Sequence, residues 1–151
     1  REGNNILYIY KIEAKVGTIR MVSHVGMVHP MYCSGVGKAI MATLPEKEVK
    51  QIWNESIIEK KTDKTITDID EMMQVLEVVR KNDASLDDEE NEEGVRCIPA
   101  CLHGYSKEVK YAFSISGPVS RMTRERVEEL AVDVKKVQEE LSRELGYYPQ
   151  N

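Results

Sequence analysis

The sequence has few cysteines, few aromatic residues other than tyrosine, and no long apolar run. Its three cysteines are an odd number without framework spacing, which excludes a disulfide-stapled secreted domain and favours the reducing cytoplasm. No apolar run approaches the ~18 residues that cross a membrane, and residues 1–5 lack the apolar core of a signal peptide. A basic stripe is also missing, because 21 lysines and arginines are scattered among 26 acidic residues, for a net charge of −5. The chain is therefore not expected to bind nucleic acid by itself.

The 151 residues are 41 % hydrophobic and 31 % charged, which is enough apolar material for one domain with its own core. Runs rich in β-branched and aromatic residues predict strands at residues 6–12, 18–24, 95–102 and 109–116, with Gly117 and Pro118 stopping the last one. A further short strand is expected at residues 83–86. Apolar residues in steps of three or four predict four helices. The first covers residues 39–44 with Ser34 as its N-cap, and the second begins at Pro45. The third follows a cap at Thr67 or Asp68, and the fourth runs from a cap at Thr123 to a stop at Gly146. The apolar face of the last helix comprises Val127, Leu130, Val134, Val137, Leu141 and Leu145. This order of elements favours an α+β fold with a largely antiparallel sheet.

Small residues precede the first helix, in the run Cys33-Ser34-Gly35-Val36-Gly37-Lys38. Free N–H groups and the helix dipole attract an anion at such a position, and glycines allow a ligand to approach the backbone. The spacing matches neither a P-loop nor a dinucleotide fingerprint. The alternative is a tight strand-to-helix turn that simply needs small side chains.

The strand at residues 95–102 places Cys97, Pro99, Cys101 and His103 on one face. Two cysteines and a histidine could bind zinc, although this spacing is not a standard zinc motif. The alternative is that the cysteines are small buried apolar residues.

The following strand has a small polar strip on one side, formed by Ala112, Ser114 and Ser116. Such a strip leaves room for a polar ligand, and the seven tyrosines offer further hydroxyl groups. The alternative is a face covered closely by a helix, with the hydroxyls bonded to the backbone.

Residues 87–93 are almost all acidic, and such a run is usually a solvated loop. Asp87 is the exception that we expect to point inward, because it follows a strand-like segment. A carboxylate only accepts hydrogen bonds, so an inward Asp87 would suit sugar hydroxyls.

A cysteine-dependent hydrolase is the rival class of function, with Cys33 or Cys97 paired to His24, His29 or His103. No recognised cysteine-enzyme signature and no G-x-S-x-G elbow surround these residues. We therefore do not expect an enzyme.

Four motifs together resemble the IclR family of bacterial transcription regulators over nearly the whole chain. They are residues 33–39 (CSGVGKA), residues 87–98 from Asp87 through GVRCI, residues 113–123 (FSISGPVSRMT) and residues 142–147 (SRELGY). The resemblance implies that residues 1–151 are the effector-binding domain, with a GAF-like fold: a curved, mainly antiparallel sheet flanked by helices. It also implies that the family's N-terminal winged helix-turn-helix is absent from this chain, together with the helix and strand that open the effector domain.

In the family, the effector lies between the sheet and the loop that leads into the first helix. The resemblance therefore implies that Gly35 and Val36 contact the effector through their backbone, and that Asp87, Cys97, Ser114 and Ser116 line the pocket with their side chains. Residues 1–11, 31–34 and 89–92 look most like regulators of sugar-acid catabolism, which implies a carboxylate such as 2-keto-3-deoxygluconate. Its anionic end would dock at the N–H groups of Gly35 to Gly37. The resemblance further implies a dimer or tetramer, DNA contact only through the absent domain, and neither a cofactor, a metal nor a membrane. Residues 101–104 depart from the small apolar residues common in the family.

Overall fold

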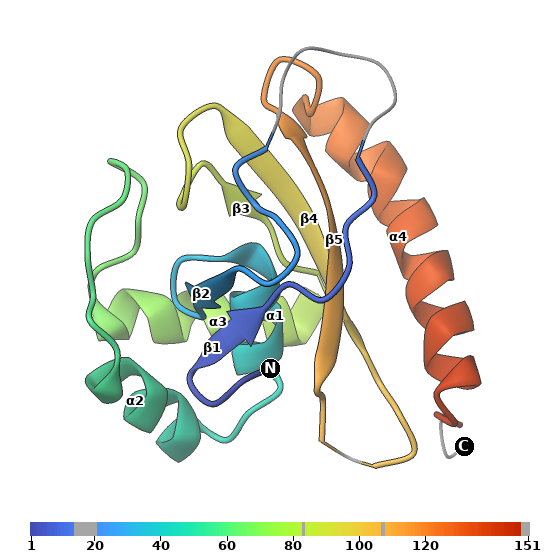
Figure 1. Ribbon diagram of the computed structural model, residues 1–151, viewed down its shortest axis with the longest axis horizontal. Helices are drawn as coiled ribbons and strands as arrows, with labels where there is room; N and C mark the ends of the chain where they lie inside the picture. Colours follow the sequence, from blue (N-terminus) through green and yellow to red (C-terminus); the bar gives the residue numbers. More distant parts are fainter. Residues whose placement is uncertain (14–20, 83, 107, 149–151) are drawn as a thin grey trace.

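The structure is a computed structural model that describes residues 1–13, 21–82, 84–106 and 108–148 (Figure 1). Its elements follow one another as β1 (Asn5–Leu7), β2 (Val28–Pro30), α1 (Gly35–Ala42), α2 (Glu46–Glu55), α3 (Ile69–Asn82), β3 (Asp87–Asp88), β4 (Val95–Leu102), β5 (Tyr111–Pro118) and α4 (Arg124–Glu144). β1 and β2 form a two-stranded sheet, and β3, β4 and β5 form a three-stranded sheet with β4 in the middle. All pairings among the described strands are antiparallel, so the predicted α+β class is confirmed.

The three-stranded sheet lies between α1 on one face and α4 on the other (Figure 1). Successive residues of a strand point to opposite faces, which divides the sheet into two environments. On the α4 face, Ile98 and Ala100 form a small apolar cluster with Met122 and Val134. On the other side of the sheet, α1, α2 and α3 share the larger core, which includes Met31, Ile40, Val49, Ile52, Met72 and Leu76.

The helices begin and end at residues with matching local chemistry. Ser34 accepts a hydrogen bond from the Gly37 N–H at the start of α1, and Thr123 accepts one from the Arg126 N–H at the start of α4. The Asp68 carboxylate accepts from the Glu71 N–H, so Asp68 rather than Thr67 caps α3. These side chains satisfy N–H groups that have no partner within the helix. The predicted first helix was placed four residues too late, because α1 begins directly after its cap.

The N-terminal strands are shorter than predicted. The ladder of β1 and β2 ends at Tyr8, whose N–H donates to the Met27 carbonyl and whose carbonyl accepts from the Gly26 N–H. The predicted strand at 6–12 is therefore wrong beyond this point, because the bulky residues that follow have no partner strand among the described residues. Residues 18–20 of the second predicted strand lie outside the described residues, and residues 21–24 form no strand.

The later strands differ from the prediction mainly at their ends. β4 has the predicted bounds, but β5 begins two residues later and continues through Pro118. Gly117 and Pro118 do not stop it, because Pro118 still pairs with Val95 across the ladder. The short strand predicted at 83–86 is instead β3 at 87–88, and residue 83 lies outside the described residues.

α4 buries the first half of its predicted apolar face, where Val134 is buried and Val127 and Leu130 pack against the small apolar cluster, but not the second half. Its buried residues are Val134, Gln138 and Ser142, whereas Val137 and Leu141 are exposed. The physical reason is that β4 ends beside this helix with backbone groups that need partners. The Gln138 side-chain N–H donates to the Cys101 carbonyl at 2.9 Å, and the Ser142 hydroxyl accepts from the His103 N–H at 3.1 Å.

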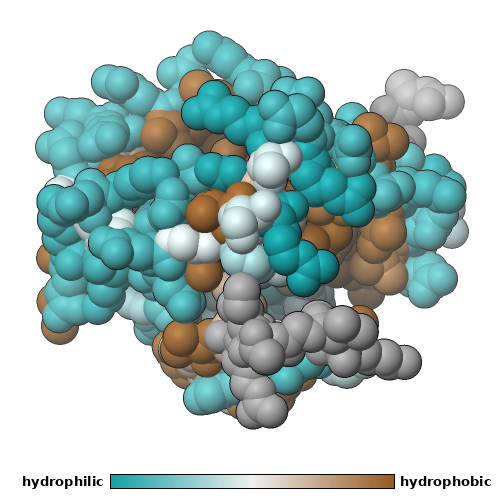
Figure 2. Space-filling model, turned by 90° about the horizontal axis from the view of Figure 1, so that it is seen from above, coloured by the Kyte–Doolittle hydropathy of each residue, from teal (hydrophilic) through white to brown (hydrophobic). Residues whose placement is uncertain are grey.

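The surface seen from above is mainly hydrophilic, with apolar side chains in separate patches (Figure 2). Among the described residues, no helix combines the length and the apolar character needed to cross a bilayer.

Candidate functional site

A cavity of about 330 Å³ lies between the start of α1 and the α1-facing side of β4 and β5. Its lining includes Gly35, Val36, Asp87, Cys97, Ser114 and Ser116, but not Gly37, whose N–H we also expected to meet the effector. The volume is at the lower end of the range typical of small-molecule pockets. Four separate segments of the sequence thus meet around one void.

The strand register explains how the side chains from the sheet come together. Cys97 of β4 pairs with Asp87 of β3 on one side and with Ser116 of β5 on the other. Ser114 is opposite Pro99, two residues further along the same face. Since directly paired residues have Cβ atoms only ~5 Å apart, the three strands present one polar row to the cavity. The Ser114 and Ser116 hydroxyls lie 3.4 Å from each other.

The start of α1 packs too closely against its surroundings for larger residues. A Cβ atom on Gly37 would lie 2.3 Å from the Met31 carbonyl oxygen. A Cβ atom on Gly35 would lie 3.0 Å from the Cβ of Asp87 and 3.2 Å from the ring of Pro99. The tight-turn alternative is therefore confirmed, and because Gly35 also lines the cavity, ligand binding at this turn stays a prediction.

Most N–H groups of the first helical turn already have protein partners. The Gly35 N–H donates to the Asp87 carboxylate, and the Gly37 N–H donates to the Ser34 hydroxyl. The Val36 N–H has no partner among the described residues. An anion at this helix start would therefore meet one uncommitted N–H rather than the three that we expected.

Asp87 points inward as predicted and is almost fully buried. Besides the Gly35 N–H, it accepts hydrogen bonds from the N–H groups of Glu90, at 3.0 Å, and Asn91. Burial raises the pKa of Asp87, while Lys38 and the three N–H donors act in the opposite direction. The carboxylate thus joins the start of α1 to the turn after β3, in addition to lining the cavity.

The rest of the acidic run is solvated only in part, because Glu93 is exposed and Asp88, Glu89 and Glu92 are partly exposed, whereas Glu90 is not. Glu90 is buried and forms an ion pair with Lys38, which is itself 1 % exposed. The Lys38 ammonium also donates to the Leu86 carbonyl at 3.0 Å. Asp88 forms an ion pair with Arg96 at 2.6 Å. The physical reason is that buried or nearby cations and backbone donors compensate these carboxylates, which costs less than leaving them unpaired.

The sequence reasoning missed the Lys38–Glu90 pair, although one signal was available. Lys38 is the one charged residue in an apolar helix, and a lysine in that position needs a buried partner. It also missed Tyr8 and His29, which line the cavity from the segment around β1 and β2. No local pattern distinguishes these two from other strand residues.

The thiols in and near the cavity are not activated. Burial raises the pKa of Cys33 to about 11 and that of Cys97 to about 12. Cys97 is hydrogen bonded to Ser116, and Cys33 contacts the Pro30 carbonyl, so neither is hydrogen bonded to a histidine within the described part of the chain. A thiolate nucleophile needs a lowered pKa, so the geometry contradicts the hydrolase alternative.

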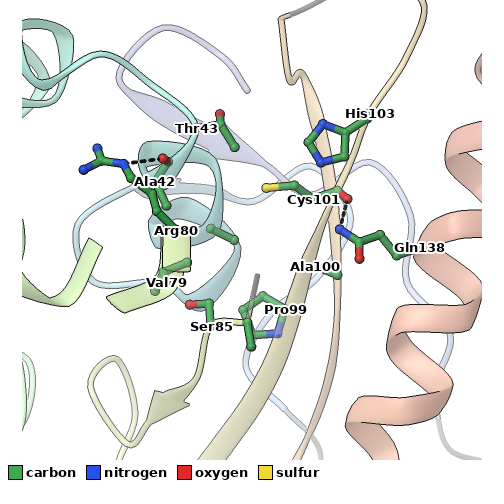
Figure 3. A pocket seen from close by; sticks show the side chains of 12 residues that line it. Ala42, Thr43, Val79, Arg80, Ser85, Pro99, Ala100, Cys101, His103 and Gln138 are labelled. Atoms are coloured by element: carbon green, nitrogen blue, oxygen red, sulfur yellow. Dashed lines mark hydrogen bonds between the residues drawn. The ribbon is translucent and has the colours of Figure 1, made fainter. Parts of the chain in front are cut away.

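The zinc alternative is also wrong, because its three residues lie in two different places. Cys97 lines the main cavity, whereas Cys101 and His103 line a separate cavity of about 190 Å³ near the end of β4 (Figure 3). Four strand residues span about 13 Å, far more than the roughly 4 Å that two thiolates sharing a zinc ion can span. Over residues 1–13, 21–82, 84–106 and 108–148, no three His, Cys, Asp or Glu side chains are grouped closely enough to hold a metal ion.

Comparisons with known proteins place this geometry in a family. Residues 1–143 match the family described as bacterial transcriptional regulator IclR, C-terminal. The chain is 33 % identical over 145 residues to the HTH-type transcriptional regulator KdgR of Escherichia coli, covering 96 % of this chain and 55 % of that protein. It is 34 % identical over 149 residues to the DNA-binding transcriptional repressor YiaJ of the same organism, covering 97 % and 53 %.

Solved structures agree with the sequence comparison. The Thermotoga maritima IclR crystal structure superimposes with a TM-score of 0.91 at 36 % identity, covering 97 % of this chain and 59 % of that one. The chain therefore spans about half the length of the curated relatives that it matches. Both relatives are named as transcriptional regulators.

Proposed function

Because the chain belongs to the IclR family of bacterial transcriptional regulators and corresponds to its C-terminal domain, we propose that it senses a small carboxylate effector in the 330 Å³ cavity. The observation that carries this proposal is the meeting of Gly35, Val36, Asp87, Cys97, Ser114 and Ser116 around that one void.

The effector carboxylate binds between the start of α1 and β5 in this proposal. The uncommitted Val36 N–H and the hydroxyls of Ser114 and Ser116 donate to its oxygens. Hydrogen bonds to a charged group contribute about 1.5–3 kcal/mol each, so three of them suffice for a specific small-molecule site. Asp87 keeps its three N–H donors and can accept a further hydrogen bond from an effector hydroxyl.

A keto-sugar acid such as 2-keto-3-deoxygluconate is the effector class that we propose. The charged side chains of the described lining, Asp87, Glu92 and Lys61, include two acids and one base. Because the Lys61 ammonium is already paired with Glu59, a second anionic group on the effector would meet mainly like charge. Neutral hydroxyls suit this surrounding better, and similarity to KdgR is consistent with a sugar acid.

Effector binding reaches DNA only through the rest of the protein in this proposal. The domain would self-associate as a dimer or tetramer and set the spacing of attached DNA-binding domains in the cytoplasm. The effector would then change DNA affinity by binding one arrangement of the oligomer better, a coupling of about 1–3 kcal/mol.

Isothermal titration calorimetry of this domain with 2-keto-3-deoxygluconate tests the proposal. We expect Ser114→Ala and Ser116→Ala each to weaken binding about tenfold or more, with unchanged thermal unfolding, because neither hydroxyl supports the core. Ser120→Ala is the matched control, since Ser120 is exposed and outside the cavity. Binding that is equal in all four proteins would overturn the assigned roles.

A further inference from the structure

A second set of polar side chains in the cavity, its second polar wall, comes from outside the three-stranded sheet. Tyr8 follows β1 and His29 lies within β2, so both come from the two-stranded sheet, whereas Ser114 and Ser116 come from β5. The Tyr8 and His29 rings meet edge to face, with centroids 6.4 Å apart and an interplanar angle of 82°. An effector whose carboxylate binds at the two serines therefore shares the cavity with a second pair of polar groups, the Tyr8 hydroxyl and the His29 ring.

Neither side chain is committed to a partner in the protein. The Nδ1 atom of His29 is buried with no hydrogen-bond partner among the described residues. Tyr8 is half-buried, and its hydroxyl makes no hydrogen bond to the described part of the protein, so it is open to a ligand in the cavity. A buried polar atom without a partner costs about 1–3 kcal/mol, and structures rarely keep one without a reason. A bound ligand that approached this wall would supply the missing partner.

Both groups are neutral at physiological pH, which decides what they can bind. Burial and the nearby charge of Asp87 raise the pKa of Tyr8 to about 12, so it keeps its proton and donates. Burial lowers the pKa of His29, so its ring carries one N–H donor and one acceptor nitrogen. A neutral donor and a neutral donor–acceptor pair match hydroxyl groups, which both donate and accept, better than a second carboxylate or phosphate.

We propose, on the basis of the proposed function, that Tyr8 and His29 form a subsite for the hydroxyl-bearing end of the effector. This wall makes the cavity selective for long polyhydroxy acids over short keto acids that share the same head group. Selectivity of this kind follows because a short acid leaves the buried Nδ1 atom of His29 unpaired and the Tyr8 hydroxyl unused, whereas a hydroxylated tail can bond to both.

The test uses two probes that differ only in the tail. 2-Keto-3-deoxygluconate carries hydroxyls beyond the keto-acid head, and pyruvate is that head alone. We expect the unchanged domain to bind the six-carbon acid at least tenfold more tightly by calorimetry. Tyr8→Phe should weaken binding of the six-carbon acid about five- to tenfold and leave pyruvate binding unchanged. His29→Phe should have the same selective effect, and Tyr10→Phe, whose ring is 77 % exposed, should have none.

The outcomes separate the two proposals. If the unchanged domain binds neither acid, the proposed function and this inference both fail. If it binds both acids and the Tyr8 and His29 variants weaken them equally or not at all, only the inference fails. Thermal unfolding of each variant shows whether its fold is intact. Because the Tyr8 and His29 variants remove different groups, one variant still tests the proposal if the other is unstable.

Discussion

Lys38 and Glu90 form an ion pair inside the protein although 52 positions separate them in the sequence. Lys38 belongs to α1, which brings Gly35 and Val36 to the cavity, and Glu90 belongs to the turn after β3, which brings Asp87 there. The pair therefore holds two walls of the cavity in place without lining it.

Removing the cation should be costly. We expect Lys38→Met to lower the free energy of unfolding by about 3–5 kcal/mol in urea denaturation, because Glu90 would remain buried without its partner. Lys64→Met is the matched control: Lys64 pairs with Asp88 and Glu89, but its side chain is 50 % exposed, so its loss should cost less than about 1 kcal/mol.

The same pair allows a stricter check. Lys38→Met with Glu90→Leu removes both charges and should recover most of the lost stability. Burial raises the pKa of Glu90 and Lys38 opposes this, so removing Lys38 raises that pKa further. The single variant should therefore lose less stability at pH 5 than at pH 7, because protonating the buried carboxyl group costs less at the lower pH. Equal losses for Lys38→Met and Lys64→Met would show that the pair does not stabilise the fold.

Gly37→Ala should destabilise the domain by at least about 3 kcal/mol. The added Cβ would lie 2.3 Å from a backbone oxygen, and backbone cannot move aside as a side chain can. Gly104→Ala is the control, because its Cβ would meet the nearest atom, the Leu145 carbonyl oxygen, at 3.4 Å. Thermal unfolding followed by circular dichroism would reveal the difference, and similar midpoints for both variants would contradict it.

Gln138→Ala should cost about 1–3 kcal/mol of unfolding free energy. The side chain is 7 % exposed and donates a buried hydrogen bond to the Cys101 carbonyl (Figure 3), so truncation removes that bond and part of the packing between α4 and β4. Gln74→Ala, on the exposed face of α3, should change stability by less than about 0.5 kcal/mol. The comparison fails if both glutamines behave alike in chemical denaturation.

Acidification should weaken the domain through His29. Burial lowers the pKa of His29 in the folded state, so the unfolded chain takes up a proton first as the pH falls. The stability that neutral His29 contributes is complete above about pH 6.5 and is lost as the pH falls through the lowered folded value. For one titrating group, the unfolding free energy cannot change by more than about 1.4 kcal/mol per pH unit. Because the His29 ring is only half-buried, we expect a smaller change.

Urea denaturation between pH 7 and pH 5 measures this effect. His29→Gln should flatten the pH dependence of the unfolding free energy, whereas His24→Gln should not, since His24 is exposed. A slope unchanged by His29→Gln would assign the acid sensitivity to other groups.

Local sequence signals determined the helices, the bounds of β4 and the choice of candidate site residues. Caps such as Ser34 and Thr123, and apolar spacing within a few residues, act over one helical turn and can be read directly. The family resemblance is confirmed by the match over residues 1–143, and the effector contacts of the six site residues stay a proposal.

Tertiary structure alone decided which polar groups are buried and which N–H groups are already engaged. Asp87 occupies the Gly35 N–H, Glu90 joins Lys38, and Gln138 replaces an apolar residue on the buried face of α4. Each of these depends on a partner far away in the sequence, and burial of a polar group is favourable only once that partner is in place. Local sequence patterns show which residue type occurs at which spacing. They do not show which distant residue will lie beside it, because that contact forms only when the chain folds.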